Sequence, residues 1–494
     1  MLLAFGISSC ESELELASPS SLTAAGFWDT ESGALAGHNG LYGDFRSQAG
    51  DFWGMGELRS DLWGGETYES PSSISTIESS FSEFTGPYAS WAGFYAQIHR
   101  INDFLENVPN TPFVNESVKN HILAQAYGLR AWYYYTLLKT YGDVPISTEV
   151  FDSSDLGALS KARSPQTEVM ALIKSDIEMS LTTFGSDDSF YNGKRTYWSK
   201  AATLALKGDV HIWSGNLMGG GTADFNTAKT ALQQIATISG IGLEPSFAGL
   251  WGTGNETNNE FIFAIDYAVD QASNIFNTFT GRSTEINPQF DYQGNPMTDF
   301  VVSGSNRYGP SEELILLLDD NDDARKHETF IYLYPNNAGY PNYDASQYFG
   351  SILNKFLGRV DGSVRFFDNN VPMYRYADVV LLIAEAKNLL GEDPSGEINQ
   401  IRARAYGANY DATTHAYVNG SPTDNANAIL DERYKEFVAE GKRWWDLRRA
   451  GDSYVFDNID FISSGEAYKL LLPIREGMIG ANPLLTQTSG WTGK

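Results

Sequence analysis

The C-terminal stretch from Asp431 to Arg449 constrains the fold of this chain more than any other segment. It reads Asp-Glu-Arg-Tyr-Lys-Glu-Phe-Val-Ala-Glu-Gly-Lys-Arg-Trp-Trp-Asp-Leu-Arg-Arg, and more than half of it is charged. Its apolar residues recur at three- and four-residue steps, which is the period of a helix with one buried face. The stretch therefore predicts an amphipathic scaffold helix in which Gly441 lies where another backbone passes close by.

This stretch also resembles the C-terminal signature of the SusD/RagB family, whose members are glycan-binding lipoproteins of the outer membrane. The residues that match in register are Glu432, Arg433, Glu436, Phe437, Glu440, Gly441, Arg443, Asp446, Leu447, Arg448 and Arg449. The segments 57–61 (Glu-Leu-Arg-Ser-Asp), 129–145 and 375–386 are similar to the family as well. The resemblance covers nearly the whole chain and is weakest in two irregular regions, 44–85 and 266–310. It implies that the C-terminal helix is scaffold and not a catalytic site.

Helical periodicity predicts a mainly α fold. Helices are expected at 27–42, 121–141, 165–184, 199–215, 224–238, 374–390 and 395–405. Such helix pairs resemble tetratricopeptide repeats, although their spacing is looser than the roughly 34-residue repeat. We therefore expect a tetratricopeptide-like helical-repeat scaffold with a loop-rich ligand face and minor β structure. The minor β structure includes a strand at 259–265, where a short apolar run occurs.

The first residues resemble the end of a lipoprotein leader. Cys10 is the sole cysteine, and it follows Ile7-Ser8-Ser9 in a pattern similar to a lipobox. The usual basic start is missing, and the alternative is an ordinary apolar N-terminus. A polar, Ser-rich run follows and suits a flexible tether. We expect a signal-peptide remnant at 1–9, a lipid-anchored tether at 10–26 and a single SusD-like domain at 27–494.

The composition restricts the kinds of molecule that this chain can bind. A net charge of −28 argues against nucleic acid and against anionic membrane surfaces, because both need a basic footprint. With one cysteine, a disulfide within the chain is impossible. Aromatic residues are plentiful, with 27 Tyr, 28 Phe and 11 Trp. Tyr and Trp beyond the needs of a core often serve ligand surfaces, because each offers a flat apolar face and a polar tip.

Motifs for catalysis are absent from the sequence. There is no GxSxG, Walker loop, GxGxxG or HExxH, and the six histidines have no metal-ligand spacing. We expect His99, His121 and His211 to be core or surface residues. The run Asp319–Asp323 lacks the sixth-position Gly and twelfth-position Glu of a calcium loop, so it predicts a solvated acidic turn. No metal and no cofactor are expected. The 62 acidic residues offer many possible carboxylate pairs, so the sequence does not decide on glycoside hydrolysis.

Aromatic residues in the two irregular regions are the candidate glycan-binding groups. Loops on a rigid scaffold concentrate binding groups, and a flat ring can cover the C–H face of a sugar. Trp63 is the best single candidate, and the alternative is that such rings only pin their loops. Trp251 is expected in the core. The full candidate set is Trp53, Trp63 and Tyr68 in the first region and Phe276, Phe290 and Tyr292 in the second.

The resemblance implies a lipid-anchored protein exposed on the outer membrane. Such a protein captures an oligo- or polysaccharide and delivers it to a SusC-type TonB-dependent transporter, without a catalytic step. Two other classes stay open, a helical glycoside hydrolase and a protein–protein adaptor built on repeat helices. Release of reducing sugar would favour the first. Peptide binding without glycan binding would favour the second.

Overall fold

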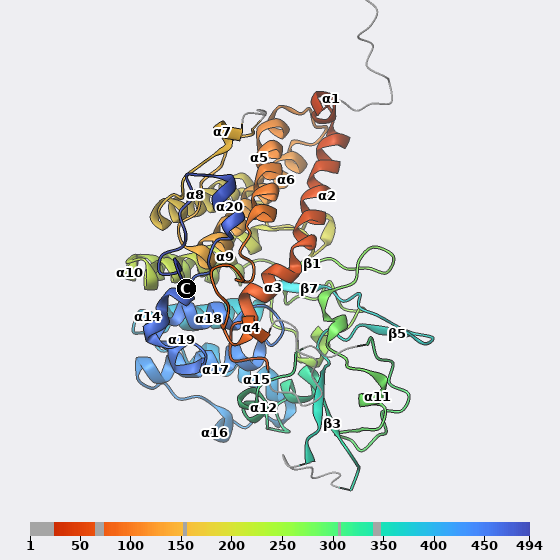
Figure 1. Cartoon of the computed structure of the whole chain (residues 1–494). Helices are drawn as coiled ribbons and strands as arrows, with labels where there is room; N and C mark the ends of the chain where they lie inside the picture. Colours follow the sequence, from red (N-terminus) through yellow and green to blue (C-terminus); the bar gives the residue numbers. More distant parts are fainter. Residues whose placement is uncertain (1–23, 65–73, 152–155, 305–307, 339–346) are drawn as a thin grey trace, which may run out of the picture.

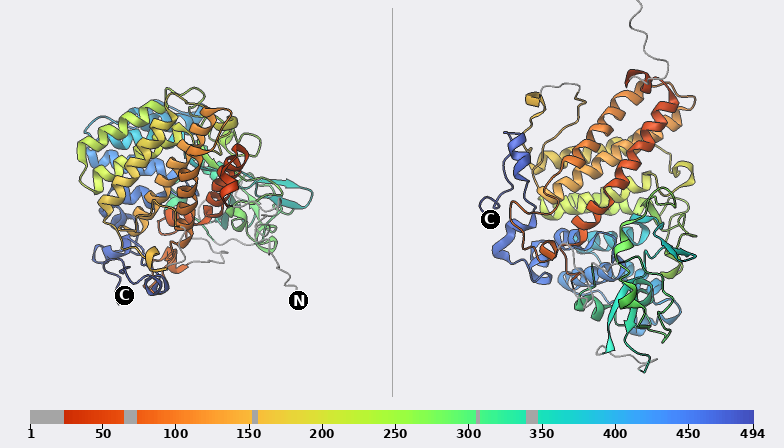
Figure 2. Two further views of the ribbon diagram at one scale, coloured as in Figure 1. Left: turned by 90° about the horizontal axis from the view of Figure 1, so that it is seen from above. Right: turned by 45° about the vertical axis from the view of Figure 1, so that its right-hand side comes forward.

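The computed structural model describes residues 24–64, 74–151, 156–304, 308–338 and 347–494. These residues are mainly helical with a few short strands, which confirms the predicted fold class. Figure 1 shows the long helices gathered on one side of the molecule and the strands β3 and β5 with long loops on the other. The two views of Figure 2 show the same division.

Ten helices form the N-terminal half of the described chain. They are α1 (Ala24–Trp28), α2 (Glu31–Ser47), α3 (Ala49–Glu57), α4 (Ile74–Ile77), α5 (Ala92–Asn107), α6 (Glu116–Tyr141), α7 (Leu156–Leu159), α8 (Gln166–Phe184), α9 (Lys200–Leu217) and α10 (Gly221–Ile235). The long ones pack on their neighbours in the sequence: α5 on α6, α6 on α8, α8 on α9 and α9 on α10. This stacking of helix pairs is the tetratricopeptide-like scaffold.

Ten further helices follow: α11 (Ser283–Ile286), α12 (Glu312–Leu317), α13 (Arg325–Thr329), α14 (Tyr376–Leu389), α15 (Ser395–Tyr406), α16 (Ala412–His415), α17 (Pro422–Glu436), α18 (Arg443–Ala450), α19 (Asp452–Asn458) and α20 (Glu476–Ala481). Helix α14 packs on α10, α15 and α17 and so continues the scaffold. No helix of the described residues has an apolar run long enough to span a bilayer.

The strands form three small antiparallel sheets in the described chain. They pair β1 (Phe261–Ile265) with β7 (Val371–Arg375), β3 (Phe330–Tyr334) with both β2 (Phe290–Asp291) and β4 (Gly350–Leu353), and β5 (Arg359–Asp361) with β6 (Val364–Phe366). Strand β1 confirms the strand predicted at 259–265. Both β1 and β7 are buried along their whole length, and β7 leads directly into α14. This pair therefore ties the loop-rich side to the helices.

The predicted helices are largely confirmed. Residues at their ends determine where two of them begin or stop. Helix α6 stops at Tyr141, as predicted, because Gly142 adopts a φ of 75°. The helix predicted at 27–42 instead spans Glu31–Ser47, where the side chain of Thr30 accepts a hydrogen bond from the Gly33 N–H. The region 44–85 was expected to have little helix, yet α3 lies within it. Its glycine and aromatic content conceals the helical period.

The prediction of one continuous helix through Gly441 is wrong. Helix α17 ends at Glu436, α18 begins at Arg443, and the residues between them form a turn. Two of these residues adopt a positive φ, Ala439 at 66° and Gly441 at 71°. Their backbone N–H groups donate to the Glu57 carboxylate at 2.6 and 2.7 Å, not to helix carbonyls. The expectation of a close backbone is confirmed, since a Cβ on Gly56 would overlap the Gly441 carbonyl.

Candidate functional site

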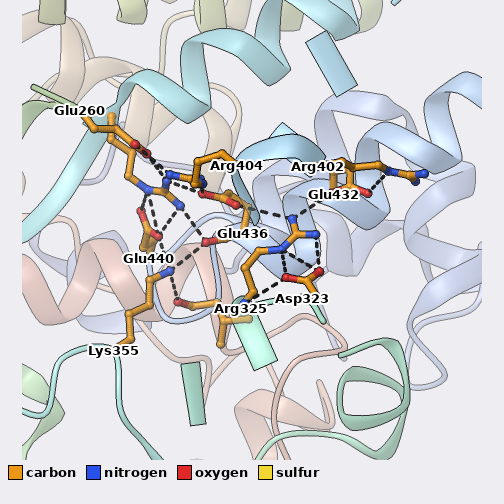
Figure 3. A network of polar contacts seen from close by, with 11 residues as sticks. Glu260, Asp323, Arg325, Lys355, Arg402, Arg404, Glu432, Glu436 and Glu440 are labelled. Atoms are coloured by element: carbon orange, nitrogen blue, oxygen red, sulfur yellow. Dashed lines mark hydrogen bonds and ion pairs between the residues drawn. The ribbon is translucent and has the colours of Figure 1, made fainter. Parts of the chain in front are cut away.

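A buried charge network, which we call the C-terminal frame, supports the loop-rich side (Figure 3). At its centre, Arg375 contacts Glu260 and Glu436 at 2.6 Å and Glu440 at 2.9 Å. Burial opposes ionisation of Glu436, but the charges of Arg404, Arg375 and Arg325 lower its pKa well below the usual range. The further members of the frame are Asp323, Arg325, Lys355, Arg402, Arg404 and Glu432.

Two carboxylates of the C-terminal stretch pair with residues outside that stretch. Glu440 contacts Lys355 and Arg375, and Glu432 contacts Arg325 and Arg402. Both carboxylates are almost fully buried, so they require strong and complete pairing. Their partners come from distant parts of the chain. A helical i, i+3 pair on an exposed face would not meet that requirement.

The segment 57–61 is clamped to the turn between α17 and α18. Besides the two bonds to Glu57, Arg443 makes a two-pronged contact with Asp61 at 2.8 and 2.7 Å. The Arg59 guanidinium lies 4.1 Å from the centroid of the Trp444 ring. We call this set of contacts the clamp. Because it fixes Asp61, it also fixes the adjoining residues Leu62 and Trp63.

Five rings next to the clamp form the inner ring cluster: Trp53, Trp63, Phe276, Phe279 and Tyr308. Neighbouring rings have centroids 5.2 to 6.5 Å apart. Trp63 is only 4% exposed and forms an antiparallel bridge with Pro310. Trp53 is 8% exposed and Phe276 is 1% exposed, whereas Tyr308 is half-buried. Tyr308 is thus the ring of this cluster that reaches the surface.

The outer ring cluster lies next to β2 and β3 and consists of Tyr292, His327, Tyr332 and Tyr348, and Phe290 lies two positions before Tyr292 on β2. Tyr292 stacks on His327 with centroids 3.7 Å apart and planes 12° apart. Tyr332 contacts both His327 and Tyr348. Burial, and then the charge of Lys326, lower the pKa of His327 to about 4, so its imidazole is neutral at pH 7. Phe290, Tyr292 and Tyr348 are half-buried and reach the surface.

The structure brings the predicted rings together as two groups. Trp53, Trp63 and Phe276 meet in the inner cluster. Tyr292 belongs to the outer cluster, and Phe290 lies on the neighbouring strand β2. Tyr68 lies outside the described residues. The burial of the first three favours the alternative that they pin their loops, while the partial exposure of Phe290 and Tyr292 leaves both able to contact a ligand. Their roles stay predictions.

Sequence reasoning missed five members of the two clusters: Phe279, Tyr308, His327, Tyr332 and Tyr348. Tyr308 and Phe279 lie in the second irregular region, whose aromatic content was a usable signal. His327 follows the acidic turn at 319–323 and carries no pattern that points to a stacked ring. Its place is set by α13 and β3, which bring it under Tyr292.

Groups considered for metal binding are occupied by other partners. In the acidic turn, Lys326 Nζ donates to Asp319 at 2.7 Å and to Asn321 at 2.8 Å. His121 and His211 are paired with Asp187 and Asp224, and His99 is exposed. Among the residues with described positions, no group of three or more His, Cys, Asp or Glu side chains is arranged to hold a metal ion. Trp251 is half-buried and packs on Phe247, Phe261 and Phe356, as expected of a packing residue.

Comparisons with known proteins identify the family. Residues 259–491 match the model of the SusD family, and residues 66–207 match a model described as starch-binding associating with outer membrane. In structure, the chain is similar to B. fragilis NanU, with 35% identity, a TM-score of 0.86, and coverage of 96% of this chain and all of that one. The chain belongs to the SusD family.

Two curated relatives place this membership in context. The SusD-like protein P38 of Formosa agariphila is 29% identical over 492 residues, which cover 91% of this chain and 90% of that protein. The starch-binding protein SusD of Bacteroides thetaiotaomicron is 30% identical over 131 residues, which cover 25% of this chain and 22% of that protein. The resemblance first found in the C-terminal stretch therefore extends over almost the whole chain.

Proposed function

We propose that this protein captures an oligo- or polysaccharide at the cell surface and delivers it to a SusC-type TonB-dependent transporter. The observation that carries the proposal is the match to SusD-type family models over residues 66–207 and 259–491, in a chain whose loop-rich side has two aromatic clusters. The capture step is binding alone, through ring stacking and hydrogen bonds to sugar hydroxyls. We propose no catalytic residue and no cofactor.

The rings divide into two roles in this proposal. Phe290, Tyr292 and Tyr308 are half-buried, so each can present part of a ring to a sugar. Trp53, Trp63 and Phe276 lie beneath the surface and hold the loops that carry the exposed rings. Stacking on a neutral His327 fixes the plane of Tyr292, which lowers the ordering cost of binding. Tyr68 is retained as a candidate contact.

The same proposal includes a location for the protein, which is attached to the outer membrane by a lipid anchor. Cys10 is the lipidated N-terminus of the mature protein, and residues 10–26 form the tether to the outer membrane. The support is the lipobox-like Ile7-Ser8-Ser9 before a sole cysteine, together with a family model whose description refers to the outer membrane. Cys10 lies outside the described residues. Mass spectrometry of membrane-derived protein tests this step, and an unmodified Cys10 would contradict it.

Glycan capture is tested with a glycan array that includes starch-derived maltooligosaccharides, followed by calorimetry on each positive. We expect binding to at least one oligosaccharide family without release of reducing sugar. Release of reducing sugar would establish the hydrolase alternative. Peptide binding with no binding to any glycan would establish the adaptor alternative.

Delivery to a transporter needs a separate experiment. We expect this protein to co-purify with a TonB-dependent transporter when membranes are solubilised after mild crosslinking in intact cells. Mass spectrometry identifies the partner and the crosslinked lysines. Recovery of this protein without any TonB-dependent transporter would contradict the delivery step and leave glycan capture standing.

A further inference from the structure

A separate cavity lies between α2, the segment 196–197 and β1. Its volume is about 260 Å³, and no member of the inner or outer ring cluster lines it. Pockets for drug-sized ligands measure about 300–1,000 Å³, so this one suits a single ring-sized group. Five lining residues carry the argument below: Asn39, Arg46, Tyr197, Asp266 and Gln271.

We propose that this cavity binds one unit of a neutral saccharide, at a site distinct from the two ring clusters. The inference rests on the proposed capture function and adds to it a second point of contact with the glycan. Three properties of the wall support it: an aromatic surface, hydrogen-bonding groups without protein partners, and a balanced charge.

The aromatic surface is Tyr197, which is half-buried and lines the cavity. One side of its ring is covered by His38, in a stack with centroids 5.5 Å apart and planes 13° apart. Tyr42 packs against the ring at 4.8 Å in an edge arrangement. Tyr197 is therefore held in a fixed plane while part of it faces the cavity. A fixed, partly exposed ring can cover the C–H face of a sugar.

The polar groups of the wall retain hydrogen-bonding capacity. Arg46 donates from Nη1 to the Asp266 carbonyl at 3.1 Å, and its other N–H groups have no partner among the described residues. Asn39 accepts from the Tyr197 hydroxyl at 3.1 Å through Oδ1, so its NH₂ group is free to donate. Within the same described part of the chain, the side chains of Asp266 and Gln271 have no hydrogen-bond partner. Sugar hydroxyls both donate and accept, and this wall offers donors and acceptors.

The charge of the wall favours a neutral ligand. It has one cation, Arg46, and one anion, the Asp266 carboxylate. The negative charge of an acidic sugar would be attracted by Arg46 but repelled by the Asp266 carboxylate. A cationic sugar would be attracted by Asp266 but repelled by Arg46. A neutral sugar can use both groups as hydrogen-bond partners without either penalty.

The walls of the cavity are preformed. The Tyr42 hydroxyl donates to Gln125 and accepts from the Trp198 N–H at 2.9 Å. The Ala264 N–H on β1 donates to the Arg195 carbonyl at 2.9 Å, which joins the strand to the segment that carries Tyr197. The free-energy cost of ordering the walls when a ligand binds in this cavity is therefore small.

The position of the cavity links it to the proposed capture face. The single segment 266–279 supplies Asp266 and Gln271 to the cavity and Phe276 and Phe279 to the inner ring cluster. A glycan that contacts both places binds the second one intramolecularly, which raises the overall affinity without new contacts at the first.

Soaked crystals and saturation-transfer NMR test the inference, with the methyl glycosides of glucose, galactose, mannose and N-acetylglucosamine as probes. We expect at least one glycoside in the cavity, against Tyr197, with a transfer signal. In the double variant Arg46→Ala/Gln271→Ala, its affinity should fall about tenfold or more. The matched control is Arg100→Ala, which removes another arginine that borders α2 and pairs with Asp44 at the surface. Arg100→Ala and Tyr292→Ala should both keep the signal.

Each outcome bears on the inference. No glycoside in the cavity, or a signal that is unchanged in the double variant, overturns it. An array-positive oligosaccharide that binds the wild type and the double variant equally overturns it too, while the capture function stands. Occupancy of the cavity by a glycoside with an otherwise negative array supports the site and counts against the capture function. Binding that disappears only in Tyr292→Ala locates the sugar at the outer ring cluster alone.

Discussion

The C-terminal frame and the outer ring cluster use their special residues in opposite ways. In the frame, the side chains of Arg375 and Glu440 are completely buried, and each charge is matched by several partners from distant segments. In the outer ring cluster, Tyr292 is half-buried, and one stacked partner fixes it while part of the ring stays exposed. The difference separates groups that maintain the structure from groups that are available to a ligand. Residue type alone does not separate them, because both regions are rich in residues typical of binding sites.

Arg375→Met is expected to give the largest effect. Glu260, Glu436 and Glu440 would lose their common partner while still buried, which costs about 3–5 kcal/mol of unfolding free energy. Urea denaturation measures the loss. The control is Arg100→Met, whose side chain is 59% exposed and whose ion pair should matter by less than about 1 kcal/mol. Similar losses in the two variants would remove the distinction between frame and surface.

Trp63→Ala should lower the unfolding free energy by about 3–5 kcal/mol, because a ring that is 4% exposed leaves a cavity among the rings of Trp53, Phe279 and Tyr308. Thermal unfolding and calorimetric titration of the folded protein are compared. A variant with wild-type stability and lost glycan affinity would return Trp63 to the binding surface, where the sequence first suggested it.

Low pH should lower the free energy of unfolding because it protonates Asp378, which lies on the helical side. Burial raises the pKa of this carboxyl, but Lys442 and Arg433 outweigh burial and lower it from 3.8 to about 2. A lowered folded-state pKa contributes stability that is complete above pH about 4 and is lost as the pH falls towards 2. The shift corresponds to about 2 kcal/mol. Urea denaturation at a series of pH values measures it, and Asp378→Asn should flatten the slope in this window. An unchanged slope in that variant would assign the acid sensitivity to other carboxyls.

Gly441→Ala tests the clamp with a smaller change. Gly441 has a φ of 71°, and a left-handed conformation costs a residue with a Cβ about 1–2 kcal/mol. A Cβ would also come within 3.1 Å of the Trp53 Cα. The melting temperature should therefore fall. Gly477→Ala is the control, because Gly477 is exposed in α20 and nothing lies within 4 Å of its Cβ position. Equal melting temperatures for the two variants would show that the turn tolerates a side chain.

Tyr292→Ala should have the smallest effect on stability, under about 1 kcal/mol, since the ring is half-buried in the turn that follows β2. Its expected effect is on binding. A central aromatic contact is worth about 2 kcal/mol or more, which is over tenfold in affinity. Calorimetry with the array-positive glycan measures it. Wild-type affinity in this variant would place the capture surface elsewhere on the molecule.

The sequence predicted the helical side well because the signal there is local. The repeat of apolar residues along α6 and α14 needs no knowledge of the rest of the fold. The break at Gly441 was not predictable in this way. It depends on Glu57, which lies 384 positions away and accepts a hydrogen bond from the Gly441 N–H. In a continuous helix, the same N–H would donate to a carbonyl of the preceding turn.

For the loop-rich side, the sequence predicted which regions carry the aromatic residues but not how those residues pack. The sequence placed the aromatic residues in the correct regions, but it contained no period from which the burial of Trp63 against Pro310 could be read. The stack of Tyr292 on His327 and the meeting of Arg46 with Asp266 likewise join segments that are not neighbours in sequence. Such contacts are set by the packing of the whole chain and not by its local pattern.

The clamp also has a consequence for how the protein is made. A chain synthesised from its N-terminus has produced Glu57 and Asp61 long before their partners at 439–443 exist. Contacts with so large a separation form late, after shorter-range helix pairs have assembled. The half-finished chain therefore carries the N-terminal helices of the scaffold, α1 to α10, and an open binding side. Its exposed rings are a hazard for aggregation until the last segments arrive, so this is the interval in which we expect the chain to depend most on chaperones.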